Sequence, residues 1–180
     1  SADPGDLTAV LNQAFAWLAG QFDLSRLAVI GHRVVHGGDV FKGPARITDR
    51  VIAQIDALAR LAPLHQPQSL ALIRVMRALY PDVPQTASFD TAFHATSPPL
   101  MRRFAIPRAL YDQGIKRYGF HGLSYRYIAG QLGDLAPDAK VVAAHLGSGA
   151  SLCAIRGGES IDSSMGFSTL DGIPMATRSG

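Results

Sequence analysis

Hydrophobic and polar positions alternate along the chain in two different periods. In some segments apolar residues recur every three or four positions, as they do on the buried face of an amphipathic helix. We expect such helices within residues 1–22 and at 48–62, 67–80, 98–105 and 122–133. Other segments are short apolar or alternating runs bounded by glycine or proline, which is typical of strands. We expect strands within 26–38, 83–90 and 141–164, the last forming a pair around a Gly157-Gly158 turn. Strands that alternate with helices predict an α/β fold.

The composition is that of a folded protein with little net charge. Of the 180 residues, 47% are hydrophobic and 17% are charged, and the formal net charge is +3. This chain can bury a core, in one domain or in parts of two. The Lys and Arg residues are scattered, and the pair Arg102-Arg103 indicates a solvated helix face rather than a nucleic-acid site. We therefore expect no nucleic-acid partner.

Several features are absent from the sequence, and their absence argues against certain locations and certain classes of enzyme. No apolar run approaches the roughly 18 residues that span a bilayer, so we expect no membrane partner. Cys153 is the single cysteine, which rules out a disulfide within the chain and favours a reducing, cytoplasmic location. The sequence also has no G-x-x-x-x-G-K-[ST] loop and no G-x-S-x-G motif, which argues against P-loop NTPases and common serine hydrolases.

Three segments at strand ends or glycine-bent turns carry candidate chemistry, and a fourth exposes backbone. In "GHRVVHGG", Arg33 lies between apolar strand residues and a glycine loop. An arginine placed there can grip a carboxylate or phosphate with two hydrogen bonds, or can form a structural ion pair. In "SFDTAFH", Asp90 ends a strand and can cap the next turn or hold a reacting group. In "YGFHGLSY", His121 precedes a helix, where its ring can face an anion.

The fourth segment, "HLGSGAS", exposes backbone between two expected strands. Gly147 and Gly149 allow backbone amides to approach an oxyanion closely, and Ser148 adds a hydroxyl group. A phosphate is the natural ligand of such a loop, although a tight turn between strands has the same sequence pattern.

Six motifs, taken together and in order, resemble the acetate kinase family, with its propionate and butyrate kinase relatives. They are "GHRVVHGG", "LAPLHQP", "FDTAFH", "YGFHGLSY", "HLGSGAS" and "DSSMGFSTLDGIPMATRSG". The resemblance implies portions of two lobes of the duplicated, ribonuclease H-like fold of sugar kinases, Hsp70 and actin. Residues 1–90 would be the remainder of the N-terminal lobe, and residues 91–180 the beginning of the C-terminal, nucleotide-binding lobe. Because the family's N-terminal phosphate loop and C-terminal part are not in this sequence, we expect the 180-residue chain alone to be inactive.

The resemblance also implies a reaction and the residues that perform it. ATP would phosphorylate a short-chain carboxylate, acetate or propionate, reversibly and by direct in-line transfer, with Mg²⁺ as a further cofactor. The implied catalytic residues are Asp90, His121 and Arg178, with Asp90 orienting an arginine or the nucleophile. The implied substrate-binding residues are Arg33, Val35, Leu64, Phe120 and Thr169. The residues implied to meet the ATP phosphates are His145, Leu146, Gly147, Ser148 and Gly149. Metal ligands would lie mainly outside this chain, and the full-length protein would be a homodimer.

Three positions depart from the usual pattern of the family. Thr169 stands where proline is usual at the substrate pocket, Ser148 where asparagine is usual, and Tyr125 where histidine is usual. The alternative to an enzyme is a catalytically silent module of the same fold that binds acyl phosphate or nucleotide. The presence of Arg33 and of all three implied catalytic side chains favours the enzyme, because a binding site has no need of groups that stabilise a transition state.

Overall fold

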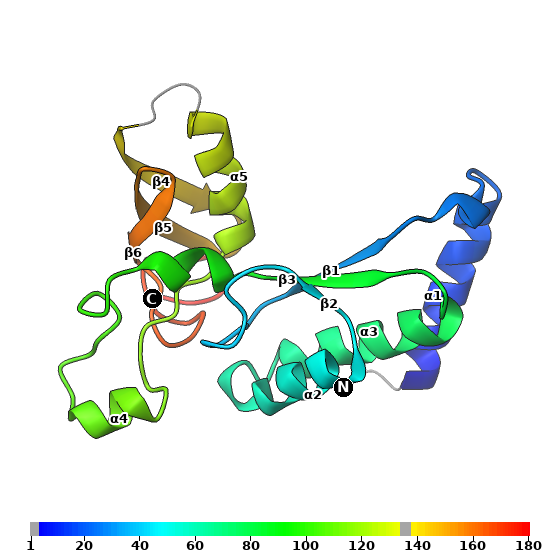
Figure 1. Ribbon diagram of the computed structural model, residues 1–180, viewed down its shortest axis with the longest axis horizontal. Helices are drawn as coiled ribbons and strands as arrows, with labels where there is room; N and C mark the ends of the chain where they lie inside the picture. Colours follow the sequence, from blue (N-terminus) through cyan, green and yellow to red (C-terminus); the bar gives the residue numbers. More distant parts are fainter. Residues whose placement is uncertain (1–3, 134–137) are drawn as a thin grey trace. The chain divides into compact units, whose positions relative to one another are not determined.

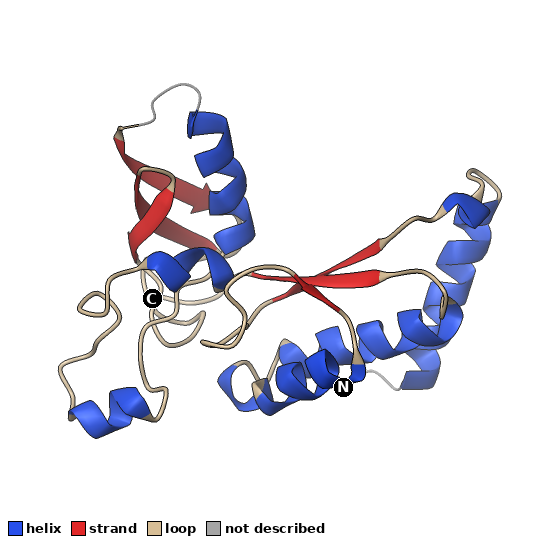
Figure 2. Cartoon of the chain, in the orientation of Figure 1, coloured by secondary structure: helices blue, strands red, loops and turns tan. Residues whose placement is uncertain are grey.

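The chain forms two compact units, each containing helices and strands (Figures 1 and 2). The computed structural model describes residues 4–133 and 138–180. One unit comprises Ser1–Val34 and Pro44–Ser88, and the other comprises Val35–Gly43 and Phe89–Gly180. The α/β fold class is therefore confirmed. The expected boundary between residues 90 and 91 concerns the lobes of the whole fold, and it stays a prediction.

The first unit combines a three-stranded sheet with three α-helices. The helices are α1 (Pro4–Ala19), α2 (Asp49–Ala57) and α3 (Gln66–Leu79), with short 3₁₀ turns at Leu24–Arg26 and Ala59–Leu61. The strands are β1 (Ile30–Val34), β2 (Ala45–Arg46) and β3 (Gln85–Phe89), in the spatial order β1-β3-β2. The sequence correctly predicted all three helices, and missed the two-residue strand β2.

Local chemistry explains where these helices begin and which side they bury. The Thr48 hydroxyl caps α2 by accepting a hydrogen bond from the Val51 backbone at 3.2 Å. The buried face of α3 includes Leu70, Ile73 and Met76, which follow the expected spacing of three residues. No helix among the described residues is both long and apolar enough to cross a membrane.

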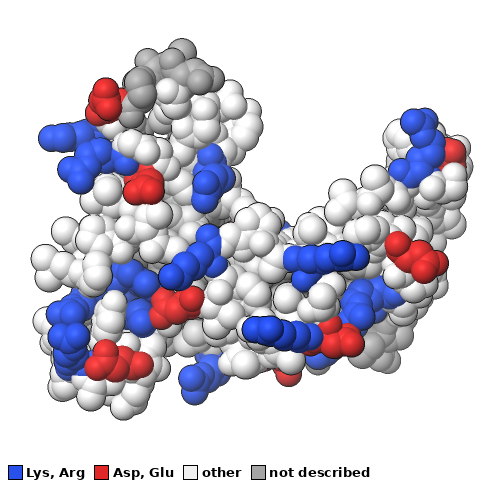
Figure 3. Space-filling view, in the orientation of Figure 1, with Lys and Arg blue, Asp and Glu red and all other residues white. Residues whose placement is uncertain are grey.

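Charged side chains of both signs are interspersed on the face drawn in Figure 3. In the first unit, Arg77 pairs with Asp49 at 2.6 Å. In the second unit, Asp39 pairs with both Arg102 and Lys116, each at 2.6 Å. Although partial burial opposes it, these two hydrogen-bonded cations hold the pKa of Asp39 below its usual range.

The second unit is built on an antiparallel sheet with the order β4-β5-β6. Its elements are a 3₁₀ helix η3 (Ala92–Thr96), α4 (Arg108–Asp112), α5 (Gly122–Gly133), β4 (Lys140–Leu146), β5 (Ala150–Arg156) and β6 (Glu159–Ser163). Gly157 and Gly158 join β5 to β6 with φ angles of 58° and 76°. A hairpin turn with two positive φ angles favours glycine at both positions, so the predicted Gly-Gly turn is confirmed.

A small core joins α5 and η3 to this sheet, and Figure 1 shows α5 alongside the strands. Phe93 comes from η3, Tyr125 and Ala129 come from α5, and the sheet contributes Ala143, Cys153 and Ile155. This core packs α5 against the two strands that flank the β4–β5 turn, so the helix and the turn are held close to each other.

The helix expected at 98–105 is wrong. That segment contains only isolated turns, and the next helix, α4, begins at Arg108. The backbone carbonyl of Arg102 accepts a hydrogen bond from the Arg117 backbone at 2.9 Å, and the Arg102 guanidinium contacts Asp39. These long-range partners replace the hydrogen bonds of a helix, and they also correct the expectation that Arg102 lies on a solvated helix face.

Candidate active site

His121 lies in a strained turn at the start of α5. Among the described residues it is the one non-glycine residue with a positive φ angle, at 58°. Such a conformation costs about 1–3 kcal/mol and persists only where its surroundings enforce it. A backbone outlier of this kind marks the turn as a candidate functional site.

Two glycines allow the surrounding chain to enforce this turn. A Cβ atom on Gly119 would come within 2.6 Å of the His94 ring, and Gly119 also has a φ angle of 74°. A Cβ atom on Gly122 would overlap the backbone carbonyl of Asp90, which accepts a hydrogen bond from the Gly122 backbone at 2.9 Å. Asp90 and the start of α5, both in the second unit, are therefore in direct contact, and Asp90 lies next to the His121 turn.

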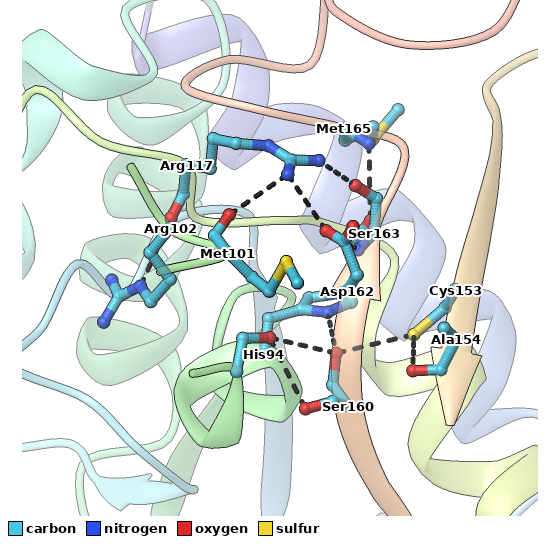
Figure 4. A network of polar contacts seen from close by, with 11 residues as sticks. His94, Met101, Arg102, Arg117, Cys153, Ala154, Ser160, Asp162, Ser163 and Met165 are labelled. Carbon is cyan, nitrogen blue, oxygen red and sulfur yellow. Dashed lines mark hydrogen bonds and ion pairs between the residues drawn. The ribbon is translucent and has the colours of Figure 1, made fainter. Parts of the chain in front are cut away.

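A buried polar network that includes His94 and Ser160 (Figure 4) lies on the other side of the same turn. His94 Nε2 lies 2.8 Å from the Phe120 carbonyl oxygen, and Nδ1 lies 2.8 Å from the Ser160 hydroxyl. Since a carbonyl only accepts, Nε2 carries the proton and Nδ1 accepts from Ser160. Burial lowers the pKa of His94 to about 4, against opposing effects of the Phe120 carbonyl and of Asp90 and Asp162. His94 is thus a neutral structural group that holds the residue before His121.

The His121 ring is held by contacts with two strands. Its Nδ1 lies 2.8 Å from the Ser151 hydroxyl on β5. Its face stacks on the ring of His145 on β4, with centroids 4.1 Å apart and planes 23° from parallel. His145 in turn lies 3.1 Å from the Ser124 hydroxyl through Nδ1. These contacts fix the direction in which His121 presents Nε2.

His121 Nε2 and Arg178 approach the same small space beside Gly149. A Cβ atom on Gly149 would lie 3.2 Å from His121 Nε2 and 3.6 Å from Arg178 Nη2. Arg178 is anchored because its Nε donates to the Thr169 carbonyl at 2.7 Å and its Nη1 donates to Thr177 at 2.8 Å. The Ser148 carbonyl accepts from the Ala176 backbone at 3.2 Å, which ties the glycine turn to the Arg178 segment.

The arrangement suits an anion whose charge increases during a reaction. An arginine and a histidine nitrogen flank a glycine without a side chain, next to the exposed turn Gly147-Ser148. Donors fixed by other contacts stabilise developing negative charge without reorganising.

The residues expected from the sequence fall into three groups. His121, His145, Gly149 and Arg178 come together, with Gly147, Ser148 and the Thr169 carbonyl at the edge of the cluster. In the second unit, Asp90, Phe120 and Val35 are buried, whereas Leu146 is exposed. Arg33 and Leu64 belong to the first unit, so their part in the site stays a prediction.

The sequence analysis noted Tyr125 only as a departure from the family pattern, and it missed Ser151. The Ser151 hydroxyl contacts both His121 and the Tyr125 hydroxyl, and Ser151 and Tyr125 are 0% and 1% exposed. A signal was present for Tyr125, because it follows His121 by four residues, about one helical turn, and its backbone N–H donates to the His121 carbonyl at 3.2 Å. Ser151 gave no comparable signal. Among the described residues no group of three or more His, Cys, Asp or Glu side chains could hold a metal ion.

Comparison with known proteins decides the family. The model of the acetokinase family matches residues 3–180. The chain belongs to the acetokinase family. The family resemblance inferred from the six motifs is therefore confirmed.

Relatives named acetate kinase and propionate kinase share about half of its residues. The chain is 51% identical over 179 residues to the acetate kinase of Rhodopseudomonas palustris strain CGA009, covering 97% of this chain and 44% of the relative. It is 49% identical over 162 residues to the propionate kinase of Citrobacter rodentium, covering 87% of this chain and 40% of the relative. This acetokinase chain thus spans less than half the length of these curated relatives.

Solved structures confirm the fold. A propionate kinase from Francisella tularensis matches with a TM-score of 0.92 and 41% identity, over 96% of this chain and 46% of the other. The acetate kinase from Entamoeba histolytica matches with a TM-score of 0.86 and 36% identity, over 99% of this chain and 46% of the other. The expected fold class, parts of the sugar kinase, Hsp70 and actin fold, is therefore confirmed.

Proposed function

We propose that the protein containing this chain phosphorylates a short-chain carboxylate, acetate or propionate, with ATP, and forms an acyl phosphate and ADP reversibly. One observation carries the proposal: His121 Nε2 and Arg178 Nη2 flank the space beside Gly149. The membership of the acetokinase family supports the same reaction, because relatives bear both the acetate kinase and the propionate kinase names.

Phosphoryl transfer to a carboxylate requires the protein mainly to position the two substrates and to stabilise negative charge. A carboxylate is ionised at neutral pH, so the acceptor needs no base, and the buried Asp90 serves to orient rather than to take a proton. In direct in-line transfer, negative charge spreads over the oxygens of the moving phosphoryl group. Arg178 supplies positive charge to that group, His121 supplies a hydrogen bond, and the turn Gly147-Ser148 meets the nucleotide phosphates.

The remaining assignments belong to the same proposal. Arg33 binds the acceptor carboxylate, and the alkyl group packs on Val35, Leu64, Phe120 and Thr169. Mg²⁺ would accompany ATP and neutralise phosphate charge, and among the described residues no group of three or more His, Cys, Asp or Glu side chains could hold it. A homodimer and a cytoplasmic location stay predictions.

Kinetics of the full-length gene product test the proposal. ADP formation with Mg²⁺-ATP and acetate or propionate is followed by a coupled assay, and acyl phosphate is trapped with hydroxylamine. We expect Arg178→Ala and His121→Ala to lower kcat by roughly 10²-fold or more, with a smaller change in the KM for ATP. Arg156→Ala is the matched control, because Arg156 is an exposed arginine at the end of β5.

The outcomes separate catalysis from binding. Turnover that depends on the carboxylate and on Arg178 supports the kinase. ATP binding without any turnover by the full-length product would instead identify a silent module and refute the proposal.

A further inference from the structure

Two buried hydroxyl groups form a chain behind His121. The Tyr125 hydroxyl lies 2.5 Å from the Ser151 hydroxyl, which lies 2.8 Å from His121 Nδ1. Both residues are almost fully buried, Tyr125 on α5 and Ser151 on β5. The two contacts therefore link the catalytic candidate His121 to groups that no ligand can touch directly.

The acidity of the two hydroxyls sets the direction of the hydrogen bonds. A phenol, with a reference pKa near 10, is a far stronger acid than an aliphatic alcohol, so it is the better donor of the pair. Burial raises the pKa of Tyr125 further, while hydrogen bonding with the Ser151 side chain and with the His145 backbone opposes the rise. Tyr125 is thus protonated at neutral pH and donates to the Ser151 oxygen.

The single hydrogen of Ser151 is then available for His121. A serine hydroxyl has one hydrogen and can accept with its oxygen at the same time. Having accepted from Tyr125, Ser151 can donate this hydrogen to His121 Nδ1, which lies 2.8 Å away. A neutral imidazole that accepts at Nδ1 carries its proton on Nε2.

We propose that Tyr125 and Ser151 are positioning residues that hold neutral His121 in the tautomer with its proton on Nε2, the nitrogen that faces Gly149 and Arg178. The proposal rests on the proposed function for its catalytic consequence, since an oxygen of the transferred phosphoryl group needs a donor there. In the other tautomer, Nε2 would present a lone pair to that oxygen and the two would repel. The hydroxyl chain therefore determines whether neutral His121 helps or hinders the transfer.

Nitrogen NMR of the full-length gene product, labelled with ¹⁵N-histidine, tests the tautomer directly. Two-bond nitrogen–proton correlations distinguish a ring protonated on Nε2 from one protonated on Nδ1. We expect His121 to be protonated on Nε2 at a pH where it is neutral. In Ser151→Ala, which loses the donor to Nδ1, we expect the other tautomer to become populated, and Ser151→Thr, which keeps a hydroxyl, to restore Nε2 protonation.

Kinetics test the consequence of that tautomer. We expect Ser151→Ala and Tyr125→Phe to lower kcat by about tenfold or more, with a smaller change in the KM for ATP. Tyr127→Phe is the matched control, because it removes the same hydroxyl from the same helix at a position that is 66% exposed. The histidine spectrum of each variant also reports whether the variant is folded.

The results distinguish this inference from the proposed function. Nδ1 protonation of His121 in the wild type, or an unchanged tautomer in folded Ser151→Ala, overturns the inference even if the kinase is active. A changed tautomer with unchanged kcat overturns its catalytic part. A wild type without carboxylate kinase activity refutes the proposed function, while the NMR result still decides the tautomer.

Discussion

Mild acid is expected to destabilise the second unit through His94. Burial lowers the pKa of His94 from 6.5 to about 4, and the Phe120 carbonyl, Asp90 and Asp162 oppose this effect. Because the folded pKa is below the unfolded one, the unfolded chain takes up the proton first as the pH falls. The stabilising contribution is therefore present above about pH 6.5 and is lost progressively toward pH 4.

The size of the effect follows from the two pKa values. The difference of 6.5 − 4 = 2.5 corresponds to about 3 kcal/mol once the folded histidine is also protonated, at about 1.4 kcal/mol for each unit. At about pH 5 the unfolded histidine is almost fully protonated and the folded one is not, so about 2 kcal/mol is lost. Solvent screens this free-energy contribution little, because His94 is 2% exposed.

The assay compares urea unfolding of the full-length gene product and of His94→Gln at about pH 7 and about pH 5. Glutamine does not titrate, and its amide can still donate to the Phe120 carbonyl. We expect the variant to be less stable at neutral pH but to lose about 2 kcal/mol less on acidification. Equal losses in the two proteins would refute the reasoning. His36→Gln is a second test with the same sign, since burial lowers the pKa of His36 to about 4 against the charge of Asp39.

Two further predictions concern the space beside Gly149 and the single cysteine. Gly149→Ala adds a methyl group 3.2 Å from His121 Nε2 and 3.6 Å from Arg178 Nη2, so we expect kcat/KM to fall by roughly tenfold or more with little change in the thermal midpoint. Gly130→Ala, with open space around its new methyl group, is the control and should stay active. Burial raises the pKa of the Cys153 thiol, which is 1% exposed, so we expect native protein to react with a thiol reagent only as it unfolds. Rapid labelling of folded protein, measured by mass spectrometry, would contradict this.

The sequence predicts elements well where local chemistry determines them. The helices at Asp49–Ala57, Gln66–Leu79 and Gly122–Gly133 follow apolar periodicity, and the Gly157-Gly158 turn follows from the φ angles that only glycine adopts easily. The segment 98–105 had the composition of a helix, yet the backbone partner of Arg102 is Arg117. A partner fifteen residues away leaves no periodic signal, so the pattern predicted the wrong structure there.

In the candidate site, too, the sequence did not reveal contacts between residues that are far apart along the chain. Glycine-flanked segments indicated His121 and Gly149, because bent backbone beside polar side chains is visible in a sequence, whereas Arg178 was implied by the resemblance to the acetate kinase family. The link from Tyr125 through Ser151 to His121 was not predicted, because it comes from a contact between α5 and β5. That contact depends on packing, which no local pattern describes.

The register of the β4–β5 hairpin connects these observations. Its three-residue turn, Gly147 to Gly149, pairs His145 with Ser151, and directly opposed residues place their side chains on the same face of a sheet. His121 can therefore stack on one member of the pair and bond to the other. A slip of one residue would turn Ser151 to the opposite face, and the hydroxyl chain to His121 would be lost. The turn that we propose as a phosphate loop thus also sets the pairing that orients the histidine beside it.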